Sequence, residues 1–456
     1  MENNPTRRLA EMVQSAALGS IAQPVELRAR DLLLDYLGVL IGGSVEPVGV
    51  AMGRYAETGP SDESSVYLKK RSGASVAAMA NGMAAHILEL DDVTNESSLH
   101  PGVVVWPAAM AAVERRHGTL GDLLAGGVAG YEVVMRVGEA LNAESVYARG
   151  FHPTGVAGVF GAAAAVGRIL GLDPEHIQHA LGLAGSMASG SLAYSQNGSD
   201  GKRLNAGWAA HAGVTAADLA AIGVSGPVDV FSGAFGVLSA YSDKPYSQAL
   251  DSDEDLFREP GLLAVAIKPY ACCRYIHPVI DACRILHADD SFGPSDVERL
   301  KISILPGGGP VIAEPVDRKR RPQNRVDAQF SVYYGAAFTL SRGSPGVDAF
   351  EGVNLNDPVI QRIADRVELF HDQELDARYP KRWGCQIEAH LTNGGRRRVL
   401  VEDPRGDARR PLVSDEVDAK FLSLAVPVDP ELAEATLAWV REASMESSLI
   451  SLGEVV

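Results

Sequence analysis

Side chains suited to proton transfer are concentrated between residues 86 and 107. Glu89, Asp91 and Asp92 lie close together in this segment, and His100 follows them in a His-Pro-Gly sequence. Apolar stretches flank the segment on both sides, and carboxylates in apolar surroundings repel one another and resist the loss of water. Because such groups need a cationic partner or a chemical role, the segment predicts part of an acid–base site.

Two further histidines lie in short motifs far along the chain. His152 occurs in Gly-Phe-His-Pro-Thr-Gly, before an Ala/Gly-rich stretch. A helix that starts there would favour a bound carboxylate beside a neutral imidazole. His277 ends a segment that runs from Lys268 through Arg274. The three histidine-bearing segments together predict a site assembled from distant parts of one chain.

Each of these residues also has a purely structural interpretation. His100 could bond to backbone at a helix start, and the two aspartates could cap a helix. The pair Lys202 and Arg203 follows a Gly/Ser/Asn-rich loop, where it could be solvated or could present a cation to a carboxylate. Arg274 could form an ion pair at a domain junction. Residues 317–321 form a basic run that we interpret as a solvated loop.

Composition excludes several classes of partner and site. The chain has 456 residues and a net charge of −17, which argues against nucleic acid and anionic membranes as partners. Its four cysteines are too few for a disulfide scaffold and lack the spacing of a zinc site. Lysines and arginines beside the histidines would repel a divalent cation, so we expect neither metal nor cofactor. No apolar run reaches the roughly 20 residues of a membrane span, and the N-terminus does not resemble a signal peptide, so we expect a cytoplasmic protein.

Periodicity predicts a mainly α fold. Residues 1–264 read almost entirely as helices, with Asp173 as an N-cap and stretches 155–170 and 206–224 apolar on most faces. Alternating strands follow at 297–305, 386–392 and 396–401, and the last two flank Asn393-Gly394, a strong hairpin signal. Helical patterns lie among the strands at 276–286, 328–340 and 358–367. We therefore predict a large all-helical domain, a smaller inserted α+β lid domain over 265–405, and a helical tail over 406–456 that rejoins the first domain.

Several motifs, in this order, resemble the MmgE/PrpD family. They are the acidic run before His100, the Phe-His-Pro segment at 151–153, Lys202-Arg203-Leu204 before Gly207-Trp208-Ala209, the segment 268–277, the helix start at 330–334 and the acidic stretch 402–407. The family includes 2-methylcitrate dehydratase, cis-aconitate decarboxylase and iminodisuccinate epimerase. The resemblance implies a helical domain with an inserted α+β lid, a homodimer, and metal-free chemistry on small polycarboxylates.

The resemblance also implies roles for individual residues. The local motifs resemble the decarboxylase and epimerase branches more closely than 2-methylcitrate dehydratase. In cis-aconitate decarboxylase, the positions matching His100, His152, Lys202 and His277 lie in the active site. The active-site aspartate of the decarboxylase corresponds to Glu89. The predicted catalytic residues are Asp91, His100, His152, Lys202 and His277. The predicted substrate-binding residues are Glu89, Asp92, Thr154, Arg203, Lys268, Arg274 and Tyr334.

The predicted function is that of a cofactor-free lyase. It would decarboxylate or dehydrate a small di- or tricarboxylate, such as cis-aconitate or a methylcitrate-like acid, by acid–base chemistry next to a carboxylate. His100 and His152 are the favoured acid–base pair, and Asp91 would set the tautomer or charge of a histidine. One alternative is an epimerase of an amino- or imino-dicarboxylate, which needs the same groups. Another is a non-catalytic helical binding protein.

Overall fold

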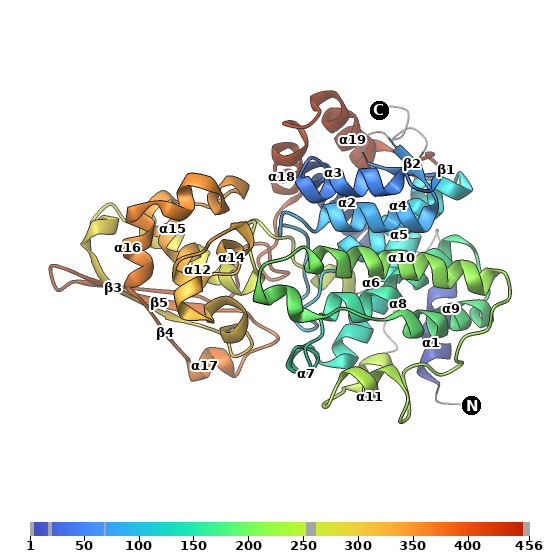
Figure 1. Cartoon of the computed structure of the whole chain (residues 1–456), viewed down its shortest axis with the longest axis horizontal. Coiled ribbons are helices and arrows are strands. Elements are labelled where there is room, and N and C mark those ends of the chain that lie inside the picture. The colour runs from blue at the N-terminus through green and yellow to red at the C-terminus, as the bar shows by residue number, and fades with distance from the viewer. Residues whose placement is uncertain (1–3, 17–20, 68–69, 252–260, 450–456) are drawn as a thin grey trace. The chain divides into compact units, whose positions relative to one another are not determined.

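A computed structural model describes residues 4–16, 21–67, 70–251 and 261–449 of the chain (Figure 1). Two compact units divide the sequence. Unit 1 comprises Met1–Ile87, Asp91–Val265 and Val413–Val456, and unit 2 comprises Leu88–Leu90 and Ala266–Leu412. Helices predominate over strands, which confirms the mainly α prediction.

Unit 1 is built from helices and one small hairpin. Its α-helices are α1 Pro5–Ser15, α2 Gln23–Ser44, α3 Pro47–Ala56, α4 Ala74–Ala85, α5 Gly102–Arg116, α6 Leu120–Leu141, α7 Ala143–Ala148, α8 Pro153–Ile169, α9 Pro174–Met187, α10 Gly201–Ala221, α11 Val237–Tyr241, α18 Ser414–Ala425 and α19 Pro430–Glu442.

Within the described part of the chain, no single helix has the length and apolar character of a membrane span, and only the bent pair α2 and α3 meets both conditions jointly.

Helix α8 lies at the centre of unit 1. Helices α5, α6, α9 and α10 pack around it (Figure 1). All but one of its residues are buried, as the Ala/Gly-rich sequence predicts for a helix that is apolar on most faces. Small residues also let helices approach closely, since a Cβ at Gly161 would lie 2.8 Å from the carbonyl oxygen of Gly130 on α6. The helix that follows His152, a predicted active-site residue, is therefore held in a dense core.

Local capping signals place two helix starts in unit 1. Asp173 accepts hydrogen bonds from the backbone N–H groups of Glu175 and His176, which confirms the predicted start of α9. Thr119 and Asp122 form a reciprocal capping box at the start of α6. Each cap satisfies backbone donors that have no partner inside the helix.

The expectation that the first domain is almost entirely helical is wrong at one place. Strands β1 Pro60–Val66 and β2 Lys70–Ser72 form an antiparallel hairpin. Their sequences are polar and lack the alternation that marks a strand. Tertiary contacts support the hairpin instead, because the buried Ser64 hydroxyl donates a 2.8 Å hydrogen bond to the carbonyl of Ala111 on α5.

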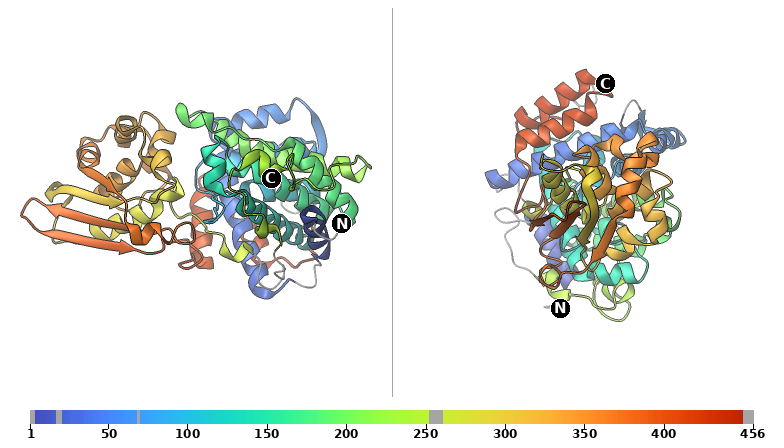
Figure 2. Two further views of the ribbon diagram at one scale, coloured as in Figure 1. Left: turned by 90° about the horizontal axis from the view of Figure 1, so that it is seen from below. Right: turned by 90° about the vertical axis from the view of Figure 1, so that its left-hand side faces the viewer.

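Unit 2 combines a four-stranded sheet with short helices on one face (Figure 2). The strands are β3 Val297–Ser303, β4 Val367–Phe370, β5 Cys385–Leu391 and β6 Arg396–Val401, in the order β4-β3-β5-β6. Only β3 and β4 are parallel. The α-helices are α12 His277–His287, α13 Val316–Arg320, α14 Arg325–Gln329, α15 Val332–Arg342, α16 Pro358–Asp365 and α17 Gln373–Asp376.

The predicted hairpin around Asn393-Gly394 is confirmed. Strands β5 and β6 pair in antiparallel register, with His390 opposite Arg396, and Gly394 has a φ of +85°. Alternate residues of β5 are buried, among them Ile387 and Ala389, and α12 packs against these two strands. The predicted alternation is thus matched by alternate burial along β5.

Two helix predictions in unit 2 are corrected by the structure. The helix expected over 358–367 ends at Asp365, because Val367 pairs with Leu300 and begins β4. The helix expected over 328–340 is two helices, α14 and α15, separated at Ser331, whose hydroxyl oxygen accepts a hydrogen bond from the backbone N–H of Tyr334. Tertiary pairing and a local cap override the helical pattern in these two places.

The basic run at 317–321 is not a solvated loop. It lies in and directly after α13, and its basic side chains bind within unit 2. Lys319 Nζ donates to the carbonyls of Val311 and Phe330 at 2.9 and 2.8 Å. The guanidinium of Arg320 donates to the carbonyls of Asp365 and Val367. The charges satisfy backbone acceptors around the sheet, so they have a structural role.

Candidate functional site

The loop between α4 and α5 carries two of the five predicted catalytic residues, Asp91 and His100. His86, Asp91, Asp92 and His100 are all buried, and His86 is completely inaccessible to solvent. Residues 88–90, in the middle of this loop, belong to unit 2, whereas the residues on either side of them belong to unit 1. Burial of several ionisable groups in one loop is costly unless they bind one another.

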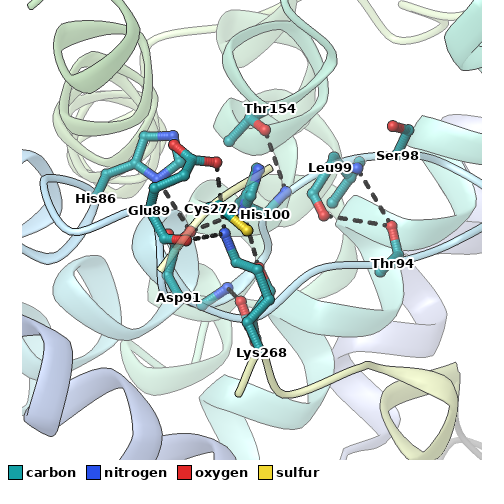
Figure 3. A network of polar contacts seen from close by, with 12 residues as sticks. His86, Glu89, Asp91, Thr94, Ser98, Leu99, His100, Thr154, Lys268 and Cys272 are labelled. Atoms are coloured by element: carbon teal, nitrogen blue, oxygen red, sulfur yellow. Dashed lines mark hydrogen bonds and ion pairs between the residues drawn. The ribbon is translucent and has the colours of Figure 1, made fainter. Parts of the chain in front are cut away.

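Hydrogen bonds within the loop fix its conformation (Figure 3). The backbone N–H of Thr94 donates to the carbonyl of Leu99 at 3.0 Å, and the Thr94 hydroxyl lies 2.6 Å from the Ser97 hydroxyl. The backbone N–H of Leu99 donates in turn to Thr94 Oγ1 at 3.3 Å. These bonds close the loop immediately before His100 and so restrict where its imidazole can lie.

Asp91 lies between two histidines. Its Oδ2 atom is 2.9 Å from His86 Nδ1 and 2.8 Å from His100 Nδ1 (Figure 3). The sequence interpretation placed Asp91 beside a histidine but did not identify His86. The available signal was the spacing of five residues between His86 and Asp91 at the end of an apolar helix, and this spacing is common in structural segments.

The tautomer of His100 follows from its partners. Its Nδ1 lies 2.9 Å from the backbone carbonyl oxygen of Asp92, and a carbonyl can only accept a hydrogen bond. Nδ1 therefore carries a proton, and Nε2 is the nitrogen that can exchange one. The backbone N–H of His100 donates to Thr154 Oγ1 on α8 at 3.1 Å. Thr154, predicted to bind substrate, thus holds the histidine in place.

His152 is the N-cap of α8 and lies beside His86. The two imidazole rings are nearly parallel, with centroids 6.2 Å apart and an interplanar angle of 20°. The ring of His100 meets His86 edge-on at 4.8 Å. The structure therefore brings three histidines of unit 1 together, with His86 between His100 and His152.

Burial and a neighbouring cation keep His86 neutral. Desolvation lowers its pKa to about 3, the positive charge of Lys202 acts in the same direction, and Asp91 opposes both effects. Lys202 and Arg203 lie in the first turn of α10, and both are buried, so the solvated-surface interpretation of this pair is wrong. Arg203 Nη2 donates to the carbonyl oxygen of Ile87 at 3.3 Å.

Asp92 has a supporting role in the structure. Its Oδ1 accepts the backbone N–H of Gly102 at 2.8 Å, and its Oδ2 accepts the Tyr131 hydroxyl at 2.6 Å. It therefore binds the first turn of α5 and connects that turn to α6. Burial raises the pKa of Asp92 to about 7, and the negative charges of Asp35 and Asp91 add to this effect.

Unit 2 contains the remaining predicted site residues. Lys268 Nζ donates to the Glu89 carbonyl oxygen at 2.7 Å and lies 3.4 Å from Glu89 Oε1, and both residues are buried. Glu89 has a φ of +56°, which is unusual for a residue other than glycine. The ion pair links the two sequence segments that make up unit 2, Leu88–Leu90 and Ala266–Leu412.

Arg274 is a buried cation, and some of its N–H groups have no acceptor among the described residues. Its Nη2 donates to Asp407 Oδ2 at 3.0 Å, while Nε and Nη1 lack a hydrogen-bond partner among the described residues. Burial lowers the pKa of its guanidinium, and Asp407 opposes this. Unpaired buried N–H groups are costly, so the geometry favours an anionic ligand at this position.

His277 and Tyr334 have internal partners in unit 2. His277 is the first residue of α12, and its Nε2 donates to the carbonyl oxygen of Cys272 at 3.2 Å. The Tyr334 hydroxyl donates to the carbonyl oxygen of Ala349 at 2.5 Å. The donor of Tyr334 is thus engaged by backbone, which leaves its oxygen as an acceptor and makes it a weak candidate for binding a carboxylate.

The His86, Asp91 and His100 side chains also have the composition of a metal site. One ligand atom from each lies within 4.8 Å of the others. The two nitrogen-to-oxygen distances of 2.9 and 2.8 Å are those of direct hydrogen bonds. Ligands about 2.1 Å from a tetrahedral zinc would lie roughly 3.4 Å apart. The observed spacing therefore fits a hydrogen-bonded triad better than a set of zinc ligands.

Comparison with known proteins identifies relatives along nearly the whole chain. The chain is 28% identical over 446 residues to the cis-aconitate decarboxylase-like protein oryM of Aspergillus oryzae, covering 94% of this chain and 92% of the relative. It is 27% identical over 437 residues to human cis-aconitate decarboxylase, covering 91% and 86%. It is 25% identical over 449 residues to the Aspergillus terreus enzyme, covering 93% and 90%.

Two family domains match in succession. The MmgE/PrpD N-terminal domain matches residues 7–249, and the MmgE/PrpD C-terminal domain matches residues 270–443. The relatives are lyases by name, which supports an enzymatic role. Together the two matches span most of the sequence, and we conclude that this chain belongs to the MmgE/PrpD family.

Proposed function

We propose that this chain is a cofactor-free decarboxylase of a small di- or tricarboxylate of the cis-aconitate type. The observation that carries the proposal is the contact of Asp91 with His100, whose Nδ1 holds its proton toward Asp91 and the Asp92 carbonyl, so that proton exchange takes place at Nε2. The named decarboxylases that align over most of the chain support the same reaction class.

The reaction needs one proton and a place for one electron pair. Loss of carbon dioxide breaks a carbon–carbon bond and leaves its electron pair on the remaining carbon. Conjugation with a second carboxylate spreads that charge, and a cation near this carboxylate stabilises it. A protonated histidine then donates its proton to the carbon. His100 and His152 are the candidates for this donor, and Lys202 is the candidate cation in unit 1.

Charge balance in each unit favours an anionic substrate. Lys202 and Arg203 are buried in unit 1, and Lys268 and Arg274 are buried in unit 2. Glu89 and Asp407 offset the two cations of unit 2. Buried cations are stable only when anions meet them, and Arg274 still has donors that no described residue accepts. A substrate with at least two carboxylates would supply such acceptors.

One experiment tests this proposal against its alternatives. Purified protein is incubated with a panel of di- and tricarboxylates in deuterium oxide and followed by proton NMR. Decarboxylation releases carbon dioxide and places one deuterium on the product, either at the carbon that lost it or at the far carbon of a conjugated double bond. Deuterium exchange with inversion at a carbon, without loss of carbon dioxide, would identify an epimerase instead. Water loss would identify a dehydratase, and no change in any acid would favour a binding protein.

We also propose that the protein forms a homodimer, as the family resemblance implies. Light scattering at several protein concentrations measures the molar mass directly. A mass near twice that of the 48.2 kDa chain is the expected result, and a mass of one chain would contradict it.

A further inference from the structure

Two imidazoles share a single carboxylate oxygen in unit 1. Both the Nδ1 of His86 and the Nδ1 of His100 lie within 2.9 Å of Asp91 Oδ2. All three side chains are buried, so solvent screens these contacts weakly. An ionised carboxylate oxygen can accept two hydrogen bonds, and it then divides its charge between both donors.

The two histidines are not equivalent in this arrangement. The single Nδ1–H of His100 is shared between Asp91 Oδ2 and the Asp92 carbonyl oxygen, and the backbone N–H of His100 donates to Thr154. His86 binds Asp91 through Nδ1, and its Nε2 lacks a hydrogen-bond partner in the described part of the chain. The hydrogen bond of His86 therefore serves to hold Asp91. The contacts of His100, in contrast, also fix the orientation of the His100 ring.

We propose that His86 is a positioning residue that holds the Asp91 carboxylate against His100 and shares its negative charge, so that His100 can both take up and release a proton. This inference deepens the proposed function and rests on it for the role of His100 in turnover. His86 itself does not exchange a proton during the reaction.

The surroundings of His86 explain why it stays neutral. The ionisable groups that act on His86 include Asp91 in the loop, Lys202 on α10 and His100, and the ring of His152, at the start of α8, lies beside it. Asp35 on α2 and Tyr131 on α6 act on Asp92, and the charges of Asp35 and Asp91 also act on each other. Burial of His86 is complete, and Lys202 disfavours a second positive charge beside it. A neutral His86 contributes an N–H dipole to Asp91 at every pH at which the protein is folded and active.

The proposal predicts the direction of a pH shift. Without the N–H of His86, the whole charge of Asp91 acts on His100 and stabilises its protonated form. The protonation midpoint of His100 then moves to higher pH, whether His100 serves as acid or as base. A histidine needed only to fill space in the core would change stability and leave this midpoint in place.

Three substitutions separate the contributions of His86. His86→Phe keeps the ring volume and removes both nitrogens. His86→Asn keeps an N–H donor near the position of Nδ1, and His86→Gln places its amide near Nε2 instead. His176→Phe is the matched control, because His176 also pairs with an aspartate, Asp173 at 2.9 Å, but at the exposed start of α9.

The first measurement is independent of turnover. Protein labelled with ¹³C at histidine Cε1 is titrated in the absence of substrate, and the His100 signal is assigned by its loss in His100→Asn. We expect the His100 midpoint to rise by about half a pH unit or more in His86→Phe and His86→Gln. It should stay at the wild-type value in His86→Asn and His176→Phe. An unchanged or lower midpoint in both His86→Phe and His86→Gln would overturn the proposal, and if His86→Phe does not fold, the Asn and Gln variants decide it.

The second measurement is the pH profile of kcat/KM on the acid that the wild type turns over. The half-maximal pH of one limb should rise in His86→Gln, with a loss of about tenfold or more in kcat, and His86→Asn should recover most of that loss. If His86→Asn and His86→Gln lose kcat equally and neither shifts a limb of the pH profile, a positioning role for His86 is rejected. If the wild type turns over no polycarboxylate, the proposed function fails, while the NMR titration still decides how Asp91 is shared.

Discussion

The Tyr131 hydroxyl donates a 2.6 Å hydrogen bond to Asp92 Oδ2, and both groups are fully enclosed in unit 1. This bond joins α6 to the loop that carries His100. Burial nevertheless raises the pKa of Asp92 from its ordinary 3.8 to about 7, because two hydrogen bonds do not offset the lost hydration and the nearby Asp35 charge. Stability should therefore depend on pH through this carboxyl.

The sign of that dependence follows from proton binding. Between pH 4 and 7 the folded protein holds a proton on Asp92 that the unfolded chain releases, so rising pH destabilises the fold. We compare the free energy of unfolding of Asp92→Asn with that of the wild type. This difference should shift in favour of the variant by on the order of 2 kcal/mol between pH 5 and pH 8. Chemical denaturation at the two pH values measures it. A difference between variant and wild type that is independent of pH would contradict the raised pKa.

A side chain at Gly102 should destabilise the fold. A Cβ there would lie 2.8 Å from both Asp92 Oδ1 and the Tyr131 hydroxyl, and Asp92 Oδ1 is itself held by the backbone N–H of Gly102. Gly102→Ala should cost roughly 1–3 kcal/mol of unfolding free energy. Gly53→Ala on α3 is the control, because a Cβ added there would meet no atom within 4 Å, and it should stabilise by up to about 1 kcal/mol. Similar effects at both sites would show that the crowding at Gly102 has no energetic consequence.

His152→Ala and Lys202→Ala should lose most turnover while the protein stays folded. His152 is the N-cap of α8 with its ring 6.2 Å from that of His86, and Lys202 is a buried cation whose charge acts on His86. The loss should be on the order of 10²-fold or more if each takes part in proton transfer or charge stabilisation. Circular dichroism checks the fold of each variant. Near wild-type rates in two folded variants would remove both residues from the site.

Arg274→Gln should weaken the binding of a diacid more than that of its monoester. Among the described residues none accepts from Nε or Nη1 of this guanidinium, whereas Asp407 occupies Nη2. Calorimetry on wild type and variant gives the difference, and we expect about tenfold or more for the diacid. Asp407→Asn is a useful comparison, because it leaves the guanidinium in place. Equal effects on diacid and monoester would assign Arg274 a purely structural role.

Activity should survive removal of divalent metals. His86, Asp91 and His100 are spaced as hydrogen-bond partners, and Lys202 adds a positive charge beside them. Protein dialysed exhaustively against a chelator should keep its turnover, with the residual metal content measured by mass spectrometry. Loss of activity that one specific metal restores would instead assign these three side chains as its ligands.

Local signals in the sequence predicted much of the fold. The Asp173 cap, the Asn393-Gly394 hairpin and the apolar α8 each depend on neighbours in sequence, and each is confirmed. Strand β4 was missed because its four residues gain their pairing from β3, far away in the chain. The β1–β2 hairpin was missed for a similar reason, since its support comes from α5.

The candidate site could be predicted only in part. The sequence drew attention to Asp91 and His100, but spacing alone does not reveal which histidine binds which oxygen. His86 lies at the end of an apolar helix, where a single histidine usually fills a core position, and its role depends on distances that only the folded chain defines. Asp92 and Thr154 were predicted to bind substrate, and the structure engages both in holding the loop and His100.

The order of synthesis has a consequence for a chain whose unit 1 is interrupted by unit 2. Arg30 on α2 donates to the carbonyl oxygen of Val440, and Arg441 donates to Asp31, so in each case the partners are separated by 410 residues. A ribosome must therefore complete unit 2 before α18 and α19 emerge to close unit 1. Until then α2 has an uncovered apolar face, and nascent chains stalled near residue 412 should bind chaperones that recognise exposed apolar helices.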